Sequence, residues 1–243
     1  MHSARVLSQL AASALLLAMA GAAQAQLYGR VDLGYSKSTN AGITDNNFAS
    51  DGVICGDTAC TVPGTISDVG SAFLITGGVG WRFNPSFRVD GTVGYRTGYK
   101  VDASVPDGLG GTNSVKSDVD SWNVMLNGYY DFNVSWGKPY VGAGIGWASN
   151  KTDDVAVTNP GFPGITLSAP GGTKTGFAWS LAGGVGVPLS SALTLDVGVR
   201  YTDLGKLATS PGPILVNGIP TGFTYSGASG HLRAWELTAG LRF

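Results

Sequence analysis

The sequence predicts an all-β fold: a transmembrane up-and-down antiparallel β-barrel of eight strands, with short periplasmic turns and four long extracellular loops. Three observations predict it. Eight segments alternate apolar and polar residues, short and long connections alternate between them, and aromatic residues lie near the segment ends. In addition, the 243 residues include only 13% charged residues, which is low for a soluble protein.

Residues 1–25 have the features of a secretory signal peptide, which leaves 26–243 as the outer-membrane β-barrel domain. Arg5 precedes an apolar stretch that ends at Ala20, and Ala23-Gln24-Ala25 follows it. Small residues in this spacing form a signal-peptidase site, so we expect cleavage after Ala25. The alternative is a retained membrane anchor, but about 15 apolar residues are short for a span.

The alternating segments have the period of two that a β-strand requires. In the first segment, Val31 and Leu33 lie on one face, whereas Arg30 and Asp32 lie on the other. Each segment is close to the roughly 9 to 11 residues with which a tilted strand crosses a bilayer. The predicted strands are 27–37, 71–83, 87–98, 121–132, 138–150, 177–187, 193–202 and 235–243.

The connections between these segments differ in length. Three are tight, around Asn84-Pro85, 134–137 and 189–192, and four are long and polar, at about 38–70, 101–116, 151–173 and 205–230. Short turns at one end and long loops at the other are typical of a bacterial outer-membrane barrel. In a soluble domain, four unstructured loops of this length would argue against the strand assignment.

The charged residues on the polar face are predicted to fill the lumen. The alternative is that they are solvated surface charges, but then the apolar face of eight strands would exceed what the inside of a small barrel holds. Lipid covers that face in a membrane barrel, and ring closure satisfies every strand edge. Because the two signs nearly balance, we expect ion pairs. The predicted network contains Arg30, Asp32, Arg82, Arg88, Asp90, Arg96, Asp131, Asp196, Arg200, Glu236 and Arg242.

Aromatic residues on the apolar face are predicted to lie at the membrane interfaces, where their amphipathic rings are favoured. Glycines crowd the opposite face, which leaves room in a narrow lumen for the arginines. The predicted interface aromatics are Trp81, Phe83, Phe87, Trp122, Phe132, Trp147, Phe177, Trp179, Tyr201 and Trp235.

Cys55 and Cys60 are predicted to form a disulfide in an exposed loop. Both follow the predicted signal peptide, and an oxidising compartment favours their pairing. The closed loop is short, so the expected entropic stabilisation is only about 2 kcal/mol. Two free thiols are the alternative. A metal site is disfavoured because no histidine is near and the spacing is not Cys-x-x-Cys.

The carboxyl end resembles a known signal. Trp235, Leu237, Ala239, Leu241 and the terminal Phe243 resemble the last-strand signal that the barrel-assembly machinery recognises in bacterial outer-membrane proteins. Segments 139–147 and 193–205 are similar to strands of the small porin-like surface-antigen barrels of proteobacteria, distant relatives of the OmpA transmembrane domain. This resemblance implies an outer-membrane location, with membrane lipid and lipopolysaccharide as partners. It also implies a role like that of relatives called porins, adhesins or haemin-binding proteins.

We expect a non-enzymatic surface or envelope-stabilising protein whose loops meet external ligands or partners. A narrow channel for small solutes is the alternative, although eight strands leave an interior just wide enough for side chains. Haemin binding through His231 is a further alternative. So is an outer-leaflet lipid hydrolase using Ser226, Ser229, His231 and Glu236, but Glu236 and His231 lie on opposite faces of the last strand.

No cofactor, metal site or nucleic-acid partner is expected. The net charge of −1 provides no basic field for a polyanion. The three glycines of 142–146 share one face of a strand, and no helix follows them to bind phosphate. The loop carboxylates do not follow a calcium-loop spacing; they are Asp45, Asp51, Asp57, Asp153 and Asp154. Arg233, on the outward face near the rim, is a candidate contact for lipopolysaccharide phosphates.

Overall fold

The computed structural model describes residues 27–243 except 52, 53 and 108. The predicted signal peptide and its cleavage site lie outside the described residues. Within them, an antiparallel sheet coils into a closed ring, because one strand, β5, pairs with neighbours on both sides and so joins the two ends of the sheet. In the described part of the chain, no helix is long and apolar enough to cross a membrane.

Eight strands form the ring, and each pairs with the barrel strands before and after it along the chain. The first and last of them, β1 and β13, also pair, so the predicted eight-stranded up-and-down barrel is confirmed. In chain order the strands are β1 (Leu27–Ser38), β3 (Ser71–Arg82), β4 (Phe87–Pro106), β5 (Thr112–Asp131), β6 (Lys138–Thr152), β9 (Gly172–Pro188), β10 (Thr194–Ala208) and β13 (Ala228–Arg242).

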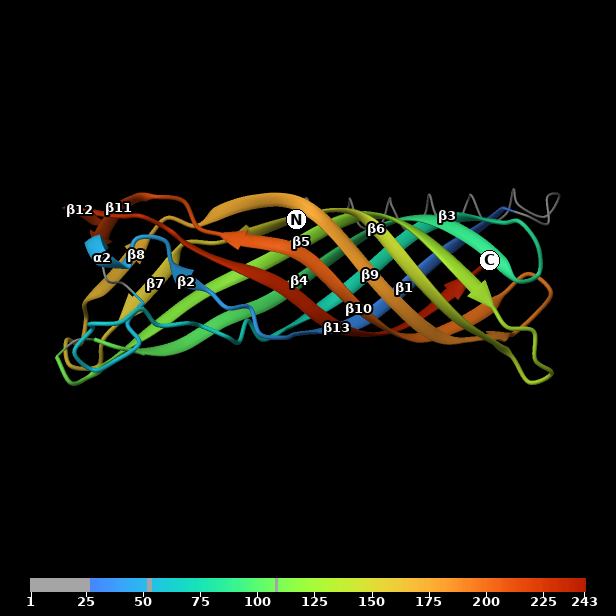
Figure 1. The fold of residues 1–243 in the computed structure, drawn as a ribbon, viewed down its shortest axis with the longest axis horizontal. Helices are drawn as coiled ribbons and strands as arrows, with labels where there is room; N and C mark the ends of the chain where they lie inside the picture. The colour runs from blue at the N-terminus through green and yellow to red at the C-terminus, as the bar shows by residue number, and fades with distance from the viewer. Residues whose placement is uncertain (1–26, 52–53, 108) are drawn as a thin grey trace.

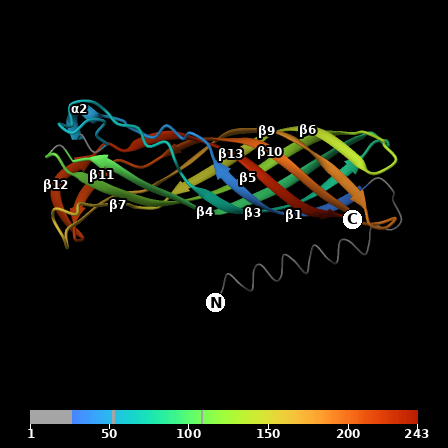
Figure 2. The same ribbon diagram turned by 90° about the horizontal axis from the view of Figure 1, so that it is seen from below.

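The barrel is elongated, and its two ends differ (Figure 1). The short connections and the carboxyl terminus lie at one end, which we call the turn end, and the small additional elements gather at the other, the loop end (Figures 1 and 2). These additional elements are β2 (Thr44–Asp45), α2 (Phe48–Asp51), β7 (Val155–Thr158), β8 (Thr166–Ala169), β11 (Gly212–Val216) and β12 (Ile219–Tyr225).

The loop-end connections contain more strand than the sequence predicts. The predicted loop 101–116 is wrong, because β4 and β5 continue as a hairpin that leaves only 107–111 as the connection. The predicted loops 151–173 and 205–230 contain the hairpins β7–β8 and β11–β12. These hairpins extend the sheet, since β7 pairs with β5, and β8 pairs with β11.

Two β-bulges explain why the alternation misled the prediction on β4 and β10. The pairing of β4 with β5 shifts between Arg96 and Tyr99, and that of β10 with β13 shifts between Asp203 and Gly205. Gly98 and Gly205 have φ angles of 100° and 78° there, which glycine adopts without a Cβ clash. A bulge inserts one residue and so exchanges the faces of the strand beyond it. Beyond the bulges of β4 and β10 the apolar residues therefore face inward, as Val115 and Val119 of β5 do without a bulge.

The inward apolar residues form a core in the loop-end part of the lumen. Tyr99, Leu204 and Leu232 are each completely buried, and the first loop, 39–70, contributes Ile66 and Val69 to the same core. This loop therefore covers the end of the lumen. Cys55 and Cys60 are joined within it, with their Cα atoms 4.9 Å apart, so the predicted disulfide is confirmed.

Outside the barrel, aromatic side chains form a belt near the loop end, with at least one from each barrel strand. Cross-strand register places them side by side: Tyr95 pairs with Trp122, and Tyr201 with Trp235. Such belts mark the membrane interface. This loop-end belt comprises Tyr35, Phe73, Tyr95, Trp122, Trp147, Phe177, Trp179, Tyr201 and Trp235. Nearer the turn end, aromatics lie on β3 to β5 and the residues that follow β3 and β5: Trp81, Phe83, Phe87, Tyr130 and Phe132.

Two glycines on the closing strand pair test how tightly the lumen is packed. A Cβ at lumen-facing Gly146 would lie within 3.0 Å of β5 backbone, whereas one at outward-facing Gly128 meets nothing within 4 Å. We expect Gly146→Val to lower the free energy of unfolding by about 1 to 3 kcal/mol and Gly128→Val to change it little. Urea unfolding in detergent micelles, followed by gel mobility of unboiled samples, measures both. Equal effects would contradict this account of the lumen.

Candidate functional site

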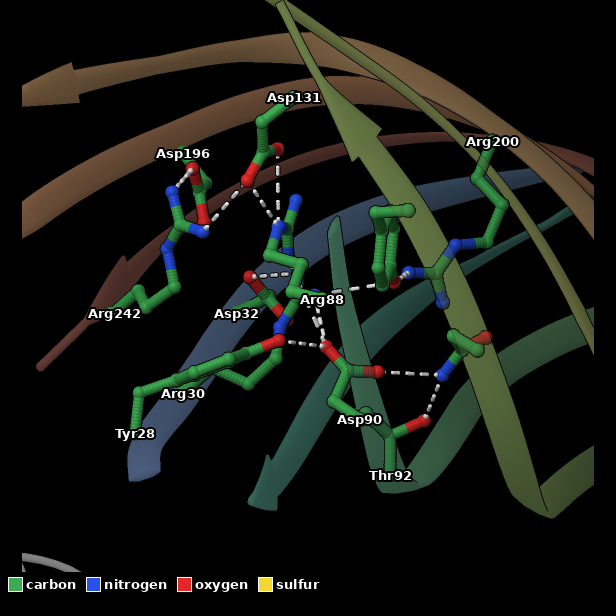
Figure 3. A network of polar contacts seen from close by, with 12 residues as sticks. Tyr28, Arg30, Asp32, Arg88, Asp90, Thr92, Asp131, Asp196, Arg200 and Arg242 are labelled. Carbon is green, nitrogen blue, oxygen red and sulfur yellow. Dashed lines mark hydrogen bonds and ion pairs between the residues drawn. The ribbon is translucent and has the colours of Figure 1, made fainter. Parts of the chain in front are cut away.

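A network of charged side chains fills the lumen between the turn end and the bulges (Figure 3). Each member contributes an inward-facing side chain from a barrel strand, and none is more than 7% exposed. Its arginines and carboxylates come from five of the eight strands, β1, β4, β5, β10 and β13. They are Arg30, Asp32, Arg88, Asp90, Arg96, Asp131, Asp196, Arg200, Glu236 and Arg242.

Arg30 is the most connected member of the network. Its Nε and Nη2 donate to the two carboxylate oxygens of Asp32 at 3.0 and 2.9 Å. Its Nη1 donates to Asp90 Oδ2 at 2.9 Å and to the Tyr129 hydroxyl at 3.1 Å. Bidentate charge-assisted bonds of this kind are roughly twice as strong as neutral ones. Arg30 therefore joins β1 to β4 and β5 across the lumen.

Asp131 lies between two arginines (Figure 3). Arg88 Nε donates to both of its oxygens at 3.1 and 3.0 Å, and Arg242 Nη1 lies 3.7 Å from Oδ2. Arg242 also donates from Nη2 to Asp196 at 3.1 Å. The Arg88 guanidinium lies 3.9 Å from the centroid of the Tyr129 ring, a cation–π contact. The positive charges are thus neutralised by carboxylates and by ring faces.

Glu236 is the centre of a second cluster, nearer the loop end. Its carboxylate accepts from Arg96 Nε at 2.6 Å, from Thr202 Oγ1 at 3.0 Å and from Ser36 Oγ at 3.3 Å. Arg96 also donates from Nη1 to Asn123 at 2.9 Å. These five residues lie on five different strands, so the cluster holds the barrel together across its interior.

Glycines leave the space that the polar side chains occupy. A Cβ at Gly144 would clash with Asn127 Oδ1, and one at Gly240 would clash with Asp32 Oδ1. Real Cβ atoms do not approach this closely. The glycine-rich polar face therefore fits a lumen packed with long side chains.

Arg82 differs from the other predicted lumen charges. It is half-buried at the end of β3 and pairs in register with Arg88. Within the described residues Arg82 forms no ion pair, and its buried Nε has no hydrogen-bond partner. The prediction included it because of its face, but its position at the turn end leaves it beside another arginine.

The sequence prediction missed the tyrosines of the network. Tyr28 donates to Asp90 at 3.3 Å, and the Tyr129 hydroxyl accepts from Arg200 at 3.3 Å. Tyr129 and Tyr140 pack edge to face, with centroids 5.7 Å apart. Their signal in the sequence is a large aromatic residue on the polar face of a strand, where a phenol hydroxyl finds partners that an apolar wall lacks.

A separate polar cluster lies on the outer face just beyond the loop-end belt; the sequence prediction named its members His231 and Arg233 but missed Asp203. His231 Nε2 and Asp203 Oδ1 are 2.6 Å apart, and Arg233 Nε donates to Asp203 Oδ2 at 3.1 Å. The residues considered for a hydrolase do not meet here. Glu236 is bound to Arg96 inside the lumen, and Ser229 Oγ donates to Asn46 at 2.7 Å.

The loop carboxylates have separate partners. Asp153 pairs with Lys151 at 2.6 Å, and Asp154 accepts from the Gly171 N–H at 2.9 Å. Over the described ranges, no group of three or more potential metal-ligating side chains lies close enough to hold an ion.

Two ion pairs of equal length provide a test of the network. Arg96–Glu236 is buried and Lys151–Asp153 is exposed, and both measure 2.6 Å. We expect Glu236→Gln to lower the free energy of unfolding by about 3 to 5 kcal/mol, because it leaves Arg96 charged and unpaired. Asp153→Asn should cost less than about 1 kcal/mol. Urea unfolding in micelles compares them, and a small effect at Glu236 would mean that water already reaches Arg96.

Comparisons with known proteins agree with this architecture. Among curated relatives, RC1281 of Rickettsia conorii, named as a candidate adhesin, is 29% identical over 169 residues, covering 68% of this chain and 65% of that protein. Outer membrane protein PagN of Salmonella typhimurium is 36% identical over 100 residues, covering 40% of each chain. The chain thus spans less than two thirds of the length of either relative.

Among solved structures, Neisserial surface protein A aligns with a TM-score of 0.48 and 19% identity, covering 89% of this chain and 95% of that one. The profile of the outer membrane protein beta-barrel domain family matches residues 8–243, which include every strand of the ring. The protein is therefore a member of the outer membrane protein beta-barrel domain family and is located in the bacterial outer membrane.

Proposed function

We propose that this chain is a non-enzymatic surface protein whose extracellular hairpins bind an external partner. The observation that carries the proposal is the filled lumen. The charged network occupies the periplasmic part, and the apolar core occupies the extracellular part under the first loop. A solute would have to displace both, so we expect the exposed hairpins, rather than the interior, to perform the function.

The extracellular hairpins are tied to one another at their tips. Asn159, after β7, donates to Asp107 and Asn113 of the β4–β5 hairpin at 2.8 and 3.0 Å. Asn217, between β11 and β12, donates to Gly164 O at 3.2 Å, and its Oδ1 accepts from the Thr166 N–H at 3.0 Å. These contacts fix the three tips relative to one another, and a fixed surface loses little entropy on binding.

Asp107 is the hydrogen-bond acceptor of the β4–β5 tip. The Leu109 N–H and the Asn159 amide donate to its carboxylate, as does the Gly111 N–H, and these bonds lower its pKa below the usual range. These hydrogen bonds favour the charged carboxylate, so they stabilise the tip fully at pH values above the ordinary carboxyl pKa. The stabilisation is lost as the pH falls through the lowered pKa of Asp107.

The tied hairpins carry exposed apolar side chains. Leu109 is 80% exposed, Ile219 71% and Phe223 73%, and Phe162 and Ile165 lie on the connection between β7 and β8. We call these five residues the tip patch. Exposed apolar patches on a polar rim mark interaction sites. The name of the Rickettsia relative, a candidate adhesin, supports adhesion as the kind of partner binding involved.

We also propose the barrel-assembly machinery and membrane lipid as partners. Phe243 pairs with Gly29 through two backbone hydrogen bonds of 2.7 and 2.9 Å, so the last residue lies at the seam between β1 and β13. This position supports the predicted role of Phe243 as a signal for the barrel-assembly machinery. The apolar outer wall supports membrane lipid as the surrounding medium.

Electrical recordings separate this proposal from a narrow channel. For the purified barrel in planar bilayers, we expect no steady single-channel conductance, because an eight-stranded lumen is filled by side chains. Glu236→Gln, which breaks the central ion pair, provides a comparison with a loosened lumen. A steady open current in the unmodified protein would favour the solute channel.

Adherence tests the tip patch directly. We expect bacteria producing an Ile219→Ser, Phe223→Ser variant to adhere to cultured epithelial cells several-fold less than those producing the unmodified protein, because buried apolar area is lost from the interface. Val62→Ser is the matched control, since Val62 is an exposed apolar residue of the first loop. The amount of folded barrel in each strain is compared by gel mobility of unboiled samples, and strains with equal amounts are used. Unchanged adherence of the double variant would contradict the proposal.

A further inference from the structure

The lumen contains one more arginine than carboxylates once Arg82 is included. Over the described strands, six arginines face five carboxylates. Four of the arginines form ion pairs, and two, Arg82 and Arg200, form none within the described residues. Arg200 pairs in register with Glu236, whereas Arg82 pairs in register with another arginine, Arg88. A charge confined without a counterion is costly, so the turn end, where Arg82 lies, favours an additional anion.

Buried donor nitrogens without partners gather at the same end. They are Arg82 Nε, Arg88 Nη1 and Nη2, and Arg242 Nε and Nη1, and none has a hydrogen-bond partner within the described residues. Arg88 Nη1 lies 3.8 Å from Asp90 Oδ2. Arg242 Nη1 lies 3.7 Å from Asp131 Oδ2, and both distances are too long for hydrogen bonds. A buried donor left unsatisfied lowers stability, so these nitrogens favour an acceptor that the barrel itself does not supply.

The three arginines converge on one part of the lumen. Arg88 and Arg242 both approach Asp131, through Nε at 3.0 Å and Nη1 at 3.7 Å respectively (Figure 3). Arg82 lies opposite Arg88 on the neighbouring strand, and the charges of both repel Arg242. Like charges placed opposite each other destabilise a sheet. An anion among the three guanidinium groups would therefore replace repulsion with attraction.

Lys138, the first residue of β6, adds a fourth cation at the periplasmic mouth of the lumen. It pairs in register with Gly186, where a Cβ would lie 3.0 Å from Arg242 Nη2. Residues paired in register share a face of the sheet, so Lys138 also lies on the lumen side. Lys138 and Arg82 are half-buried, so ions dissolved in the periplasm reach the cluster past these two side chains.

We propose that the turn-end cations, Arg82, Arg88, Lys138 and Arg242, bind a small inorganic oxyanion from the periplasm. Both Nη groups of Arg88 lack an acceptor, and a guanidinium binds two oxygens of a phosphate through such a pair. The three arginines lie on three strands, so the ligand needs several acceptor atoms, which a tetrahedral oxyanion has and a halide lacks. The site lies at the opposite end of the barrel from the tip patch (Figure 1), so it does not depend on the proposed surface role.

Isothermal titration calorimetry of the folded barrel in nonionic detergent, with inorganic phosphate in a chloride-free buffer, measures binding. We expect one phosphate per barrel, and we expect Arg82→Gln to weaken binding roughly tenfold because a charge-assisted hydrogen bond is lost. Removing Arg82 leaves no carboxylate unpaired, so the variant should fold. Lys100→Gln is the matched control, since it removes the same charge from an exposed position of β4. Equal weakening by both variants, or no binding by the unmodified barrel, would overturn the proposal.

Urea unfolding followed by gel mobility provides a second readout, because a ligand that binds only the folded barrel raises its stability. We expect the urea midpoint to rise when phosphate replaces chloride at constant ionic strength. The double variant Arg82→Gln, Lys138→Gln should lose this rise, whereas Lys100→Gln should keep it. An equal rise in the double variant would mean that phosphate acts through its general effect on the solvent, and the proposal would be wrong. If chloride displaces phosphate at equal concentration in the calorimeter, the assignment to an oxyanion is wrong.

Discussion

The pairing of charges buried in a closed lumen is the interaction on which this structure depends. Arg30 and Glu236 each bond to side chains on several strands, so the network is satisfied only when the whole ring is in place. Glycines on the polar face follow from this pairing, because the long side chains need the space of the missing Cβ atoms. The apolar outer wall follows as well, since each strand that turns its charges inward must turn its alternate residues outward.

The two bulges divide the barrel into regions that face different solvents. On the periplasmic side of Gly98 and Gly205 the strands are polar inside and apolar outside, as hydrocarbon demands. On the extracellular side they are apolar inside and polar outside, like a soluble β-domain. The loop-end belt lies close to this transition. The Asp203–His231–Arg233 cluster lies there too, because the β10 bulge follows Asp203 directly.

Most of the barrel fold could be predicted from the sequence, because alternation with a period of two can be read from neighbouring residues alone. Alternation predicted the eight strands and placed Arg30 and Glu236 on their polar face, whereas the disulfide was predicted from export to an oxidising compartment. The prediction failed at the bulges. Beyond Gly98 and Gly205 one extra residue exchanges the inward and outward positions of the strand, so the alternation is interrupted and the strand was predicted as loop. The prediction also could not foresee which charges pair. Arg82 lies on the same face as Arg88 and pairs with it in register, yet of the two only Arg88 forms an ion pair within the described residues.

The seam between β1 and β13 has a consequence for biogenesis. Ser36 and Arg30 on β1 are bonded to acids whose other contacts come from distant parts of the ring. If the barrel entered the lipid before β1 and β13 had paired, the charged side chains of the network would contact acyl chains, at a cost of several kcal/mol each. Such an intermediate is unstable. We therefore expect closure of the barrel and the removal of water from its lumen to occur together, in one cooperative step. An environment that keeps the unpaired edges of β1 and β13 in contact with water until their hydrogen bonds form would lower the free-energy barrier to closure.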